Sequence, residues 1–325
     1  MQIKSIWREI ILAVIMGMIL PGITLNWAVE REEPTAPTVR QPERVPEVVK
    51  PTLEMYLRKR DGTLQTMDMD TYLVGVILAE MPASFEAEAK KAQAVVARTY
   101  ARKAWVTGGK HGDGAVCQDS ACCQAYISVK EYLAQLGSET AVEEARTAVW
   151  ETSGQVLTYE GQLIEATYFS CSGGSTEDAA AVWGTDFPYL RAVDSPGEEY
   201  ALHHTDRVYF TKEDFAAALG LKLTGDPADW IGTATHTPGG GVDTIEIGGK
   251  SFSGKELRSM LGLRSTAFSM APDAWGVSIT TKGFGHRVGM SQYGADAMAM
   301  AGSTYEEILA HYYRGAILEL TNVTP

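Results

Sequence analysis

A short helix that ends in a carboxylate is predicted near the start of the globular part of the chain. Four positions spaced i, i+4, i+7 and i+11 form one helix face: Met69, Leu73, Val76 and Glu80. Asp68 or Asp70 stands where such a helix begins, and Pro82 ends it because the residue before proline avoids the α region. The pattern therefore predicts a helix over 69–79, with Glu80 at its end on the apolar face.

The rest of the chain alternates strand-like and helical segments. A longer helix is predicted over 85–105, and strand-like runs follow at 155–159 and 164–169 between glycine-rich turns. Helix starts with capping-box spacing, the last a weaker variant, are Ser253 with Glu256, Ser303 with Glu306, and Thr211 with Asp214. Short strands mixed with separated helices predict an α+β fold around one cleft over about 52–320, with a small subdomain inserted at 208–270.

The first 27 residues are predicted to carry the chain out of the cytoplasm. Lys4 and Arg8 precede an apolar stretch over 10–27 that would reach ~27 Å as a helix, close to the thickness of a bilayer core. Basic residues before this stretch and acidic ones after it place the N-terminus in the cytoplasm. We therefore expect a single-pass membrane anchor over 1–27 and a spacer rich in proline and glutamate over 28–51. The alternative is a cleaved signal peptide, which would also export the folded part.

Composition and charge narrow the class of protein. With 45% hydrophobic and 21% charged residues, the chain of 325 residues has the composition of a globular protein. Its formal net charge of -13 lacks the positive footprint of a protein that binds nucleic acid. A phosphate-binding P-loop is excluded as well, because Thr244 occupies the first glycine position before Gly249-Lys250-Ser251.

The predicted position of Glu80 has consequences for its chemistry. A carboxylate at the C-terminal end of a helix meets the negative end of the helix dipole, and apolar neighbours withhold solvation, so both raise its pKa. Such a glutamate can hold a proton near neutral pH and donate it to a glycosidic oxygen. The alternative is a glutamate that turns outward at a frayed helix end. On the next helix, Arg98 either pairs with a substrate carboxylate or lies on the surface.

Separated stretches of the sequence resemble one known family. They are AEMPASFEAEAKKAQAVVARTYA at 79–101, YFSCSGGSTEDAAAVWGTDFPYL at 168–190, and GFGHRVGMSQYGADAMA at 283–299, followed by YEEILAHYYRG at 305–315. Together they are similar to the signature of stage II sporulation protein D, SpoIID, a family of lytic transglycosylases that act during spore engulfment. The match spans about 53–315, so the resemblance covers nearly all of the predicted globular part.

The resemblance implies roles for particular residues. Glu80, in the Glu-Met-Pro string, matches the catalytic residue of the family, and Arg98, in the Ala-Arg-Thr-Tyr string, matches the arginine that serves its substrate cleft. The polar residues expected to orient the glycan are Ser172, Thr176, Glu177, Tyr189, His286, Ser291, Gln292 and Tyr293. For each of these, a structural role is the alternative.

The resemblance also implies a metal site. Some family members have a zinc site of one histidine and two cysteines, and His111, Cys117 and Cys123 have that spacing here. Zinc takes four ligands, so this set leaves a position for water, substrate or another side chain. The alternative in an oxidising compartment is a disulfide from Cys117 to Cys122 or Cys123.

The implied activity is cleavage of the bond between N-acetylmuramic acid and N-acetylglucosamine in denuded glycan strands, which leaves 1,6-anhydro ends. The implied partners are peptidoglycan, a SpoIIP-like amidase and endopeptidase, and a SpoIIM-like membrane protein. Two alternatives stay open. One is a muramidase that uses Glu80 with Glu177, Asp178 or Asp186 as the second carboxylate. The other is a non-catalytic, glycan-binding enhancer of a cell-wall amidase.

Overall fold

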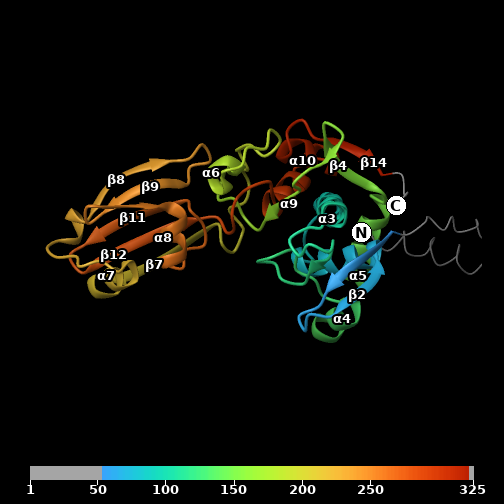
Figure 1. The fold of residues 1–325 in the computed structure, drawn as a ribbon, viewed down its shortest axis with the longest axis horizontal. Coiled ribbons are helices and arrows are strands. Elements are labelled where there is room, and N and C mark those ends of the chain that lie inside the picture. The colour runs from blue at the N-terminus through green and yellow to red at the C-terminus, as the bar shows by residue number, and fades with distance from the viewer. Residues whose placement is uncertain (1–52, 322–325) are drawn as a thin grey trace, which may run out of the picture. The chain divides into compact units, whose positions relative to one another are not determined.

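Residues 53–321 are described by a computed structural model, shown in Figure 1. The first elements are β1 (Glu54–Arg58), β2 (Leu64–Asp68), α2 (Met69–Glu80), α3 (Ala87–Thr107), β3 (Val116–Cys117), α4 (Val129–Leu136), α5 (Glu139–Glu151), β4 (Gln155–Tyr159), β5 (Gln162–Leu163), β6 (Tyr168–Phe169) and α6 (Ala179–Trp183). There follow β7 (Thr205–Thr211), α7 (Lys212–Leu219), the 3₁₀ turn η1 (Pro227–Asp229), β8 (Ile231–His236), β9 (Val242–Ile247), β10 (Lys250–Ser253), α8 (Gly254–Met260), β11 (Phe268–Asp273) and β12 (Gly276–Lys282). The last are β13 (Met290–Ser291), α9 (Gln292–Met300), α10 (Tyr305–Tyr312) and β14 (Ile317–Leu320). Helices with several small sheets confirm the α+β class.

Local signals set both ends of α2. The Asp68 carboxylate accepts the backbone N–H of Thr71 at 2.8 Å as the N-cap, and Met81 leaves the helix with φ -111° and ψ 129°. Glu80 is therefore the last helical residue, as predicted. The expected single apolar face does not describe this helix, since its buried residues surround it: Met69, Tyr72, Leu73, Val74, Gly75, Val76 and Ile77. α2 is a core helix rather than an amphipathic one.

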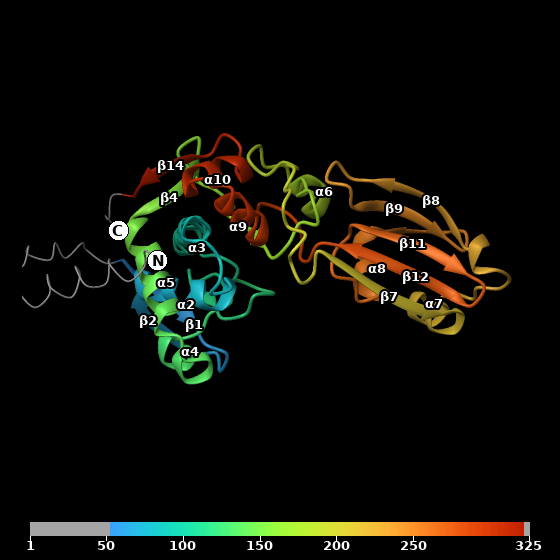
Figure 2. The same cartoon turned by 180° about the vertical axis from the view of Figure 1, so that it is seen from behind.

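The main hydrophobic core is built around α3. Figure 2 shows α9 and α10 on one side of α3, and α2 and α5 on another. Buried side chains of the core include Val95 of α3, Leu73 of α2 and Tyr312 of α10. β14 pairs with β4 in antiparallel fashion, and β13 pairs in parallel with β6, where Met290 lies opposite Tyr168. This last pairing brings the chain near residue 290 beside the chain near residue 168.

A second hydrophobic cluster lies between residues 208 and 279. Its buried members are Phe215, Leu219, Trp230, Val242, Ile245, Ile247, Phe252, Leu257, Leu261, Leu263, Phe268, Val277 and Ile279. They come largely from two sheets with strand orders β10-β9-β8 and β11-β12-β7, which Figure 2 shows as two layers with α7 and α8 beside them. The insertion expected at 208–270 falls within this segment, and its status as a separate subdomain stays a prediction.

The expected single-pass membrane location is not supported and is withdrawn. Across residues 53–321, no helix combines the length and the apolar character needed to cross a bilayer. The segments on which the expectation rested, the anchor over 1–27 and the spacer over 28–51, lie outside the described residues.

Candidate active site and metal-ligating cluster

Glu80 lines a cavity of about 620 Å³. The cavity wall is formed by Glu80, Tyr100, Lys110, Ser120, Ala121, Cys122, Cys123, Glu165, Ala166, Thr167, Tyr168, Phe169, Ser170, Trp183, Phe187, Phe284, Gly285, His286 and Gln292. Aromatic and apolar groups with a few convergent polar side chains, around a space of this size, are typical of a ligand site. The cavity at the end of α2 is therefore the candidate active site.

Three donors hold the Glu80 carboxylate. The Ala125 backbone N–H donates to Oε1 at 2.6 Å, the Tyr168 hydroxyl donates to Oε1 at 3.0 Å, and the Gln292 amide donates to Oε2 at 3.4 Å. Burial raises the pKa of Glu80, and these hydrogen bonds oppose the rise because they favour the charged form. The net direction is upward. A carboxyl group that retains its proton to higher pH inside a cavity has the properties of a general acid.

The segment that carries Ala125 is fastened to α2. The Tyr72 hydroxyl donates to Gln124 Oε1 at 2.7 Å inside the core. Gly75 permits the close approach, since a Cβ at that position would lie 2.4 Å from the ring of Tyr126. These contacts on either side of Ala125 hold its N–H against the carboxylate at the end of the helix.

A neutral histidine forms another part of the wall. Burial, followed by the charges of Arg258 and Lys110, lowers the pKa of His286 to about 4. Its Nδ1 accepts the backbone N–H of Val288 at 3.1 Å, so the proton of the neutral ring is on Nε2. The ring lies against Trp183, with the ring centroids 5.2 Å apart. Near neutral pH, His286 is therefore an uncharged hydrogen-bond donor.

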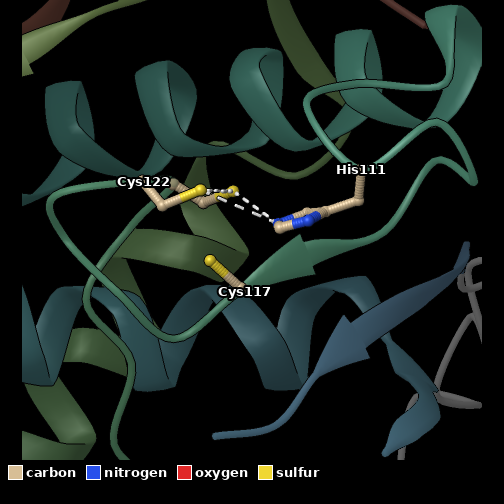
Figure 3. Close-up of side chains that lie close together, drawn as sticks. His111, Cys117 and Cys122 are labelled. Atoms are coloured by element: carbon tan, nitrogen blue, oxygen red, sulfur yellow. Dashed lines mark hydrogen bonds between the residues drawn. The ribbon is translucent and has the colours of Figure 1, made fainter. Parts of the chain in front are cut away.

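One histidine and three cysteines form a cluster beside the cavity. Figure 3 shows His111, Cys117 and Cys122 pointing toward one another, and the ligand atoms of these residues and Cys123 all lie within 4.8 Å. His111 Nε2 is 3.8 Å from Cys122 Sγ and 3.6 Å from Cys123 Sγ, and the two sulfurs are 3.9 Å apart. Ligands around tetrahedral zinc, with bonds of roughly 2.0–2.3 Å, lie roughly 3.5–3.8 Å from one another. The residues therefore fit a zinc site of one histidine and three cysteines.

Cys122 is the ligand candidate that the sequence prediction missed. The prediction took His111, Cys117 and Cys123 and left the fourth position open, whereas the adjacent thiol of Cys122 also reaches the cluster. The signal available in the sequence was the Cys122-Cys123 doublet itself. All cysteines of the described segment are free, so the alternative disulfide from Cys117 is not formed. Cys171 is buried away from the cluster and donates to Glu198 at 3.1 Å.

Arg98 does not reach the cavity. Its guanidinium is buried and donates to the backbone carbonyls of Thr152, Val149 and Gln155 at 2.9, 3.1 and 3.3 Å. Burial lowers its pKa to about 10, and the nearby Asp70 carboxylate, 3.7 Å away, favours the charged form. These contacts fasten the end of α5 and the start of β4 to α3. The structure thus gives Arg98 a place in the core, neither in the cleft nor on the surface.

Ser172, Thr176 and Glu177 belong to a buried polar network outside the cavity wall. The Glu177 carboxylate pairs with Arg287 at 3.2 Å and accepts the Thr237 hydroxyl at 2.7 Å. The Ser172 hydroxyl donates to a buried carboxylate at 2.9 Å, and the Thr176 hydroxyl accepts a backbone N–H at 2.9 Å. All three predicted residues are fully buried, so the structure does not bring them to the acid.

Gln292 and His286 line the cavity, whereas Tyr189, Ser291 and Tyr293 are not among its lining residues. The Tyr189 hydroxyl accepts the backbone N–H of Glu165, a wall residue, at 3.0 Å. Ser291 accepts an N–H from the first turn of α9 at 3.2 Å as the N-cap of that helix. The Tyr293 ring packs edge-on against Phe85, with centroids 4.9 Å apart. Among the predicted glycan-orienting residues, Tyr189 therefore contacts a wall residue from outside the lining, and Ser291 and Tyr293 make structural contacts.

The wall holds a second carboxylate, although none of the predicted ones. Glu177, Asp178 and Asp186 are absent from the residues that line the cavity. Glu165 does line it, and its carboxylate pairs with Lys103 at 2.7 Å. Any second carboxylate in this site is therefore Glu165.

Several wall residues were not predicted from the sequence. Tyr168 begins the second matched string, and Trp183 and Phe187 lie inside it. Lys110 directly precedes the predicted ligand His111. Three of these wall residues thus lie in a string that matches the family. Periodicity alone does not separate wall residues from core residues.

Comparison with known proteins identifies the family. A family model described as "Stage II sporulation protein", SpoIID, matches residues 58–159. Stage II sporulation protein D of Bacillus subtilis (strain 168) is 39% identical over 263 residues, which cover 79% of this chain and 76% of that protein. The chain belongs to the stage II sporulation protein D family.

Other relatives extend the SpoIID match. Stage II sporulation protein D of Bacillus amyloliquefaciens is 36% identical over 316 residues, which cover 94% of this chain and 91% of that protein. A protein of Bacillus subtilis (strain 168) named "Amidase enhancer" is 32% identical over 307 residues, which cover 76% of this chain and 40% of that protein. The SpoIID resemblance drawn from the sequence strings is confirmed.

Proposed function

We propose that this SpoIID-family protein is a lytic transglycosylase that cleaves the bond between N-acetylmuramic acid and N-acetylglucosamine in denuded glycan strands, during engulfment in endospore formation. The main support is the Glu80 carboxyl group, which lines a cavity of about 620 Å³, is held by three donors and has a raised pKa. The names of the relatives, stage II sporulation protein D, support a role in sporulation.

One carboxyl group is enough for this reaction. Protonated Glu80 donates its proton to the glycosidic oxygen as the bond from that oxygen to muramic C1 breaks. The carboxylate so formed accepts the proton of the muramic 6-hydroxyl, whose oxygen bonds to C1. Glu80 regains its proton, no water is consumed, and the product carries a 1,6-anhydro ring.

The neighbours of Glu80 support both halves of this cycle. Tyr168 and Gln292 donate to the carboxylate, so they stabilise the charge that appears when Glu80 gives up its proton. The neutral ring of His286 also lies in the wall, so it borders the ligand space without adding a charge. Trp183 and Phe187 offer apolar surface in the wall, against which the faces of sugar rings can pack.

A two-carboxylate muramidase has weaker support. Such an enzyme needs a second carboxyl group across the scissile bond. Glu177 is fully buried in an ion pair with Arg287, so its charge is already paired inside the fold. Glu165 reaches the cavity, but its charge is already paired with Lys103.

We also propose that His111, Cys117, Cys122 and Cys123 hold zinc. Four protein ligands complete a tetrahedron, which is typical of structural zinc sites, and bound zinc would contribute folding energy by cross-linking the loop. The four side chains thereby fix the segment whose next residues include Ala125. In this proposal the metal site supports the acid through the backbone.

The relative named "Amidase enhancer" motivates a second candidate, a non-catalytic glycan-binding enhancer of a cell-wall amidase. The two candidates make different demands on Glu80, since an enhancer does not need its proton. For the transglycosylase, we propose a SpoIIP-like amidase and endopeptidase as a partner, because denuded strands require prior removal of stem peptides. A SpoIIM-like membrane protein is proposed as a further partner on the SpoIID resemblance alone.

Mass spectrometry of products from purified denuded glycan separates the candidates. Wild type, Glu80→Gln and the control Glu139→Gln, an exposed position at the start of α5, are compared. Anhydro ends from wild type and control but not from Glu80→Gln support the transglycosylase. Reducing ends would make the enzyme a muramidase. No cleavage, together with equal stimulation of an amidase by all three proteins, would make it an enhancer.

A further inference from the structure

Among the described residues, the cavity wall holds one cation that forms no ion pair with a carboxylate. The ionisable acidic and basic residues of the wall, apart from His286 and the thiols, are Glu80, Lys110 and Glu165. Glu165 is paired with Lys103 at 2.7 Å, and Glu80 holds its proton to higher pH than an ordinary glutamate. Within the described part of the chain, Lys110 is therefore the positive side chain of the wall that a ligand in the cavity meets.

Lys110 is placed to bind an anion. Its ammonium donates one hydrogen bond to the backbone carbonyl of Cys122, which leaves two of its three N–H groups for a ligand. Within residues 53–321 it forms no ion pair, and its side chain is exposed. Lys110 and His286 both line the cavity, so the ammonium and the neutral ring border the same space. The tether to Cys122 limits the number of side-chain conformations to be ordered on binding.

The proposed substrate carries the matching charge. Each N-acetylmuramic acid unit of a denuded strand has a free lactyl carboxylate, whereas a stem peptide converts that group into an uncharged amide. The protein as a whole is repelled by such a polyanion, because its own formal net charge is -13. A local cation in the cavity offsets that repulsion where the strand is bound.

We propose that Lys110 binds the free lactyl carboxylate of N-acetylmuramic acid, and that this contact makes the site prefer strands from which stem peptides have been removed. The inference rests on the proposed function only in its choice of glycan, since it concerns binding rather than the proton transfers of Glu80. An exposed ion pair of this kind contributes up to about 1 kcal/mol, which corresponds to about fivefold in affinity.

The test measures dissociation constants in a Glu80→Gln background, where the strand is not consumed. The ligands are denuded glycan and the same glycan with its carboxyl groups reduced to alcohols. With Lys110 present, reduction is expected to weaken binding about fivefold, and with Lys110→Met reduction is expected to have no effect. Lys110→Arg keeps the charge and is expected to retain the difference. Lys130→Met, at an exposed position on α4, is the matched control and also retains it.

Equal sensitivity of Lys110 and Lys110→Met proteins to carboxyl reduction would overturn the proposal, as would loss of that sensitivity in Lys110→Arg. Because Lys110 adjoins His111, the metal content and thermal unfolding of each variant are measured as well. If Lys110→Met loses its metal, the outcome for Lys110→Arg is used to judge the proposal instead. In the parent background, cleavage by Lys110→Met is expected to show a raised KM with unchanged kcat. If the wild type cleaves nothing yet the binding pattern appears, the transglycosylase fails while the assignment of Lys110 stands.

Discussion

The backbone N–H of Ala125 donates to Glu80 Oε1 at 2.6 Å, two residues after the last cysteine of the metal-ligating cluster. The proposed acid and the proposed zinc ligands are thus joined by a short piece of backbone rather than by a shared ligand. A loop held by four side chains keeps that N–H in place, and a released loop does not. The metal is therefore expected to affect catalysis although no reacting atom would touch it.

The first prediction concerns the fourth ligand. Cys122→Ser removes one of four thiol or imidazole donors, so zinc affinity is expected to fall at least ~10-fold, and glycan cleavage and thermal stability to fall with it. Zinc content after dialysis against a weak chelator measures the effect. Cys171→Ser is the matched control, because Cys171 is buried away from the cluster. Unchanged zinc content in Cys122→Ser would return the site to three protein ligands.

A second prediction follows from the buried position of Glu80. Its pKa is raised in the folded state, so its contribution to stability is fully present below the pKa of an unfolded glutamate and is lost as pH rises through the folded pKa. Glu80→Gln never ionises, and its carbonyl can accept the hydrogen bonds from Ala125 and Tyr168. The Gln292 amide can turn to accept from the new NH₂ group.

Glu80→Gln is therefore expected to melt about 2 °C above wild type at pH 8, with the gap closing toward pH 4. Thermal unfolding across this pH range measures the gap, and Glu139→Gln should show none because that side chain is exposed. A gap that is independent of pH, or of opposite sign at pH 8, would mean that folding does not raise the pKa of Glu80.

A third prediction concerns the hydroxyl of Tyr168. This hydroxyl donates to the Glu80 carboxylate and so lowers the pKa of Glu80, against the upward effect of burial. Tyr168→Phe removes the donor, so the pKa of Glu80 rises further. Since the proposed acid must be protonated to start the reaction, the alkaline limb of the pH profile of kcat/KM should move to higher pH.

Tyr126→Phe is the control for this shift, because within the described residues the donors to Glu80 are Ala125, Tyr168 and Gln292. Its ring still packs on Gly75, and its pH profile should match that of the wild type. An alkaline limb that moves down in Tyr168→Phe would show that the limb reports another group.

Sequence patterns predicted the parts of the site that depend on local chemistry. Asp68 and Pro82 bracket α2 within a few residues of chain, so the end of the helix at Glu80 could be predicted without tertiary information. Local patterns can also be degenerate. Ser303 with Glu306 and Thr304 with Glu307 both fit the capping box, and the structure uses the second pair, one residue later than predicted.

Residues that depend on long-range pairing were harder to place. Gln292 meets Glu80 because two-residue strands pair Met290 with Tyr168 and Ser291 with Phe169, and so short a pairing has no periodic signature in the sequence. The buried networks of Glu177 and Arg98 likewise form with segments distant in sequence. Polar side chains in matched strings therefore look alike in sequence, whether they line a cavity or hold the fold together.

The final prediction tests the place of Arg98. Arg98→Met leaves the carbonyls of Val149, Thr152 and Gln155 without their donor inside the core, so the free energy of unfolding should fall by about 3 kcal/mol. Urea denaturation measures this change. Arg146→Met, at an exposed ion pair with Glu143, should change it by less than about 0.5 kcal/mol.

The same variant separates a core role from a cleft role. If Arg98 only fastens α5 and β4 to α3, the fraction of Arg98→Met that remains folded should bind glycan with unchanged KM, and its loss of activity should follow its loss of folded protein. Wild-type stability combined with a raised KM would instead place the guanidinium on a substrate carboxylate. Lys110 would then no longer be the one cation, among the described residues, that is proposed to reach the strand, because two positive groups would contact it.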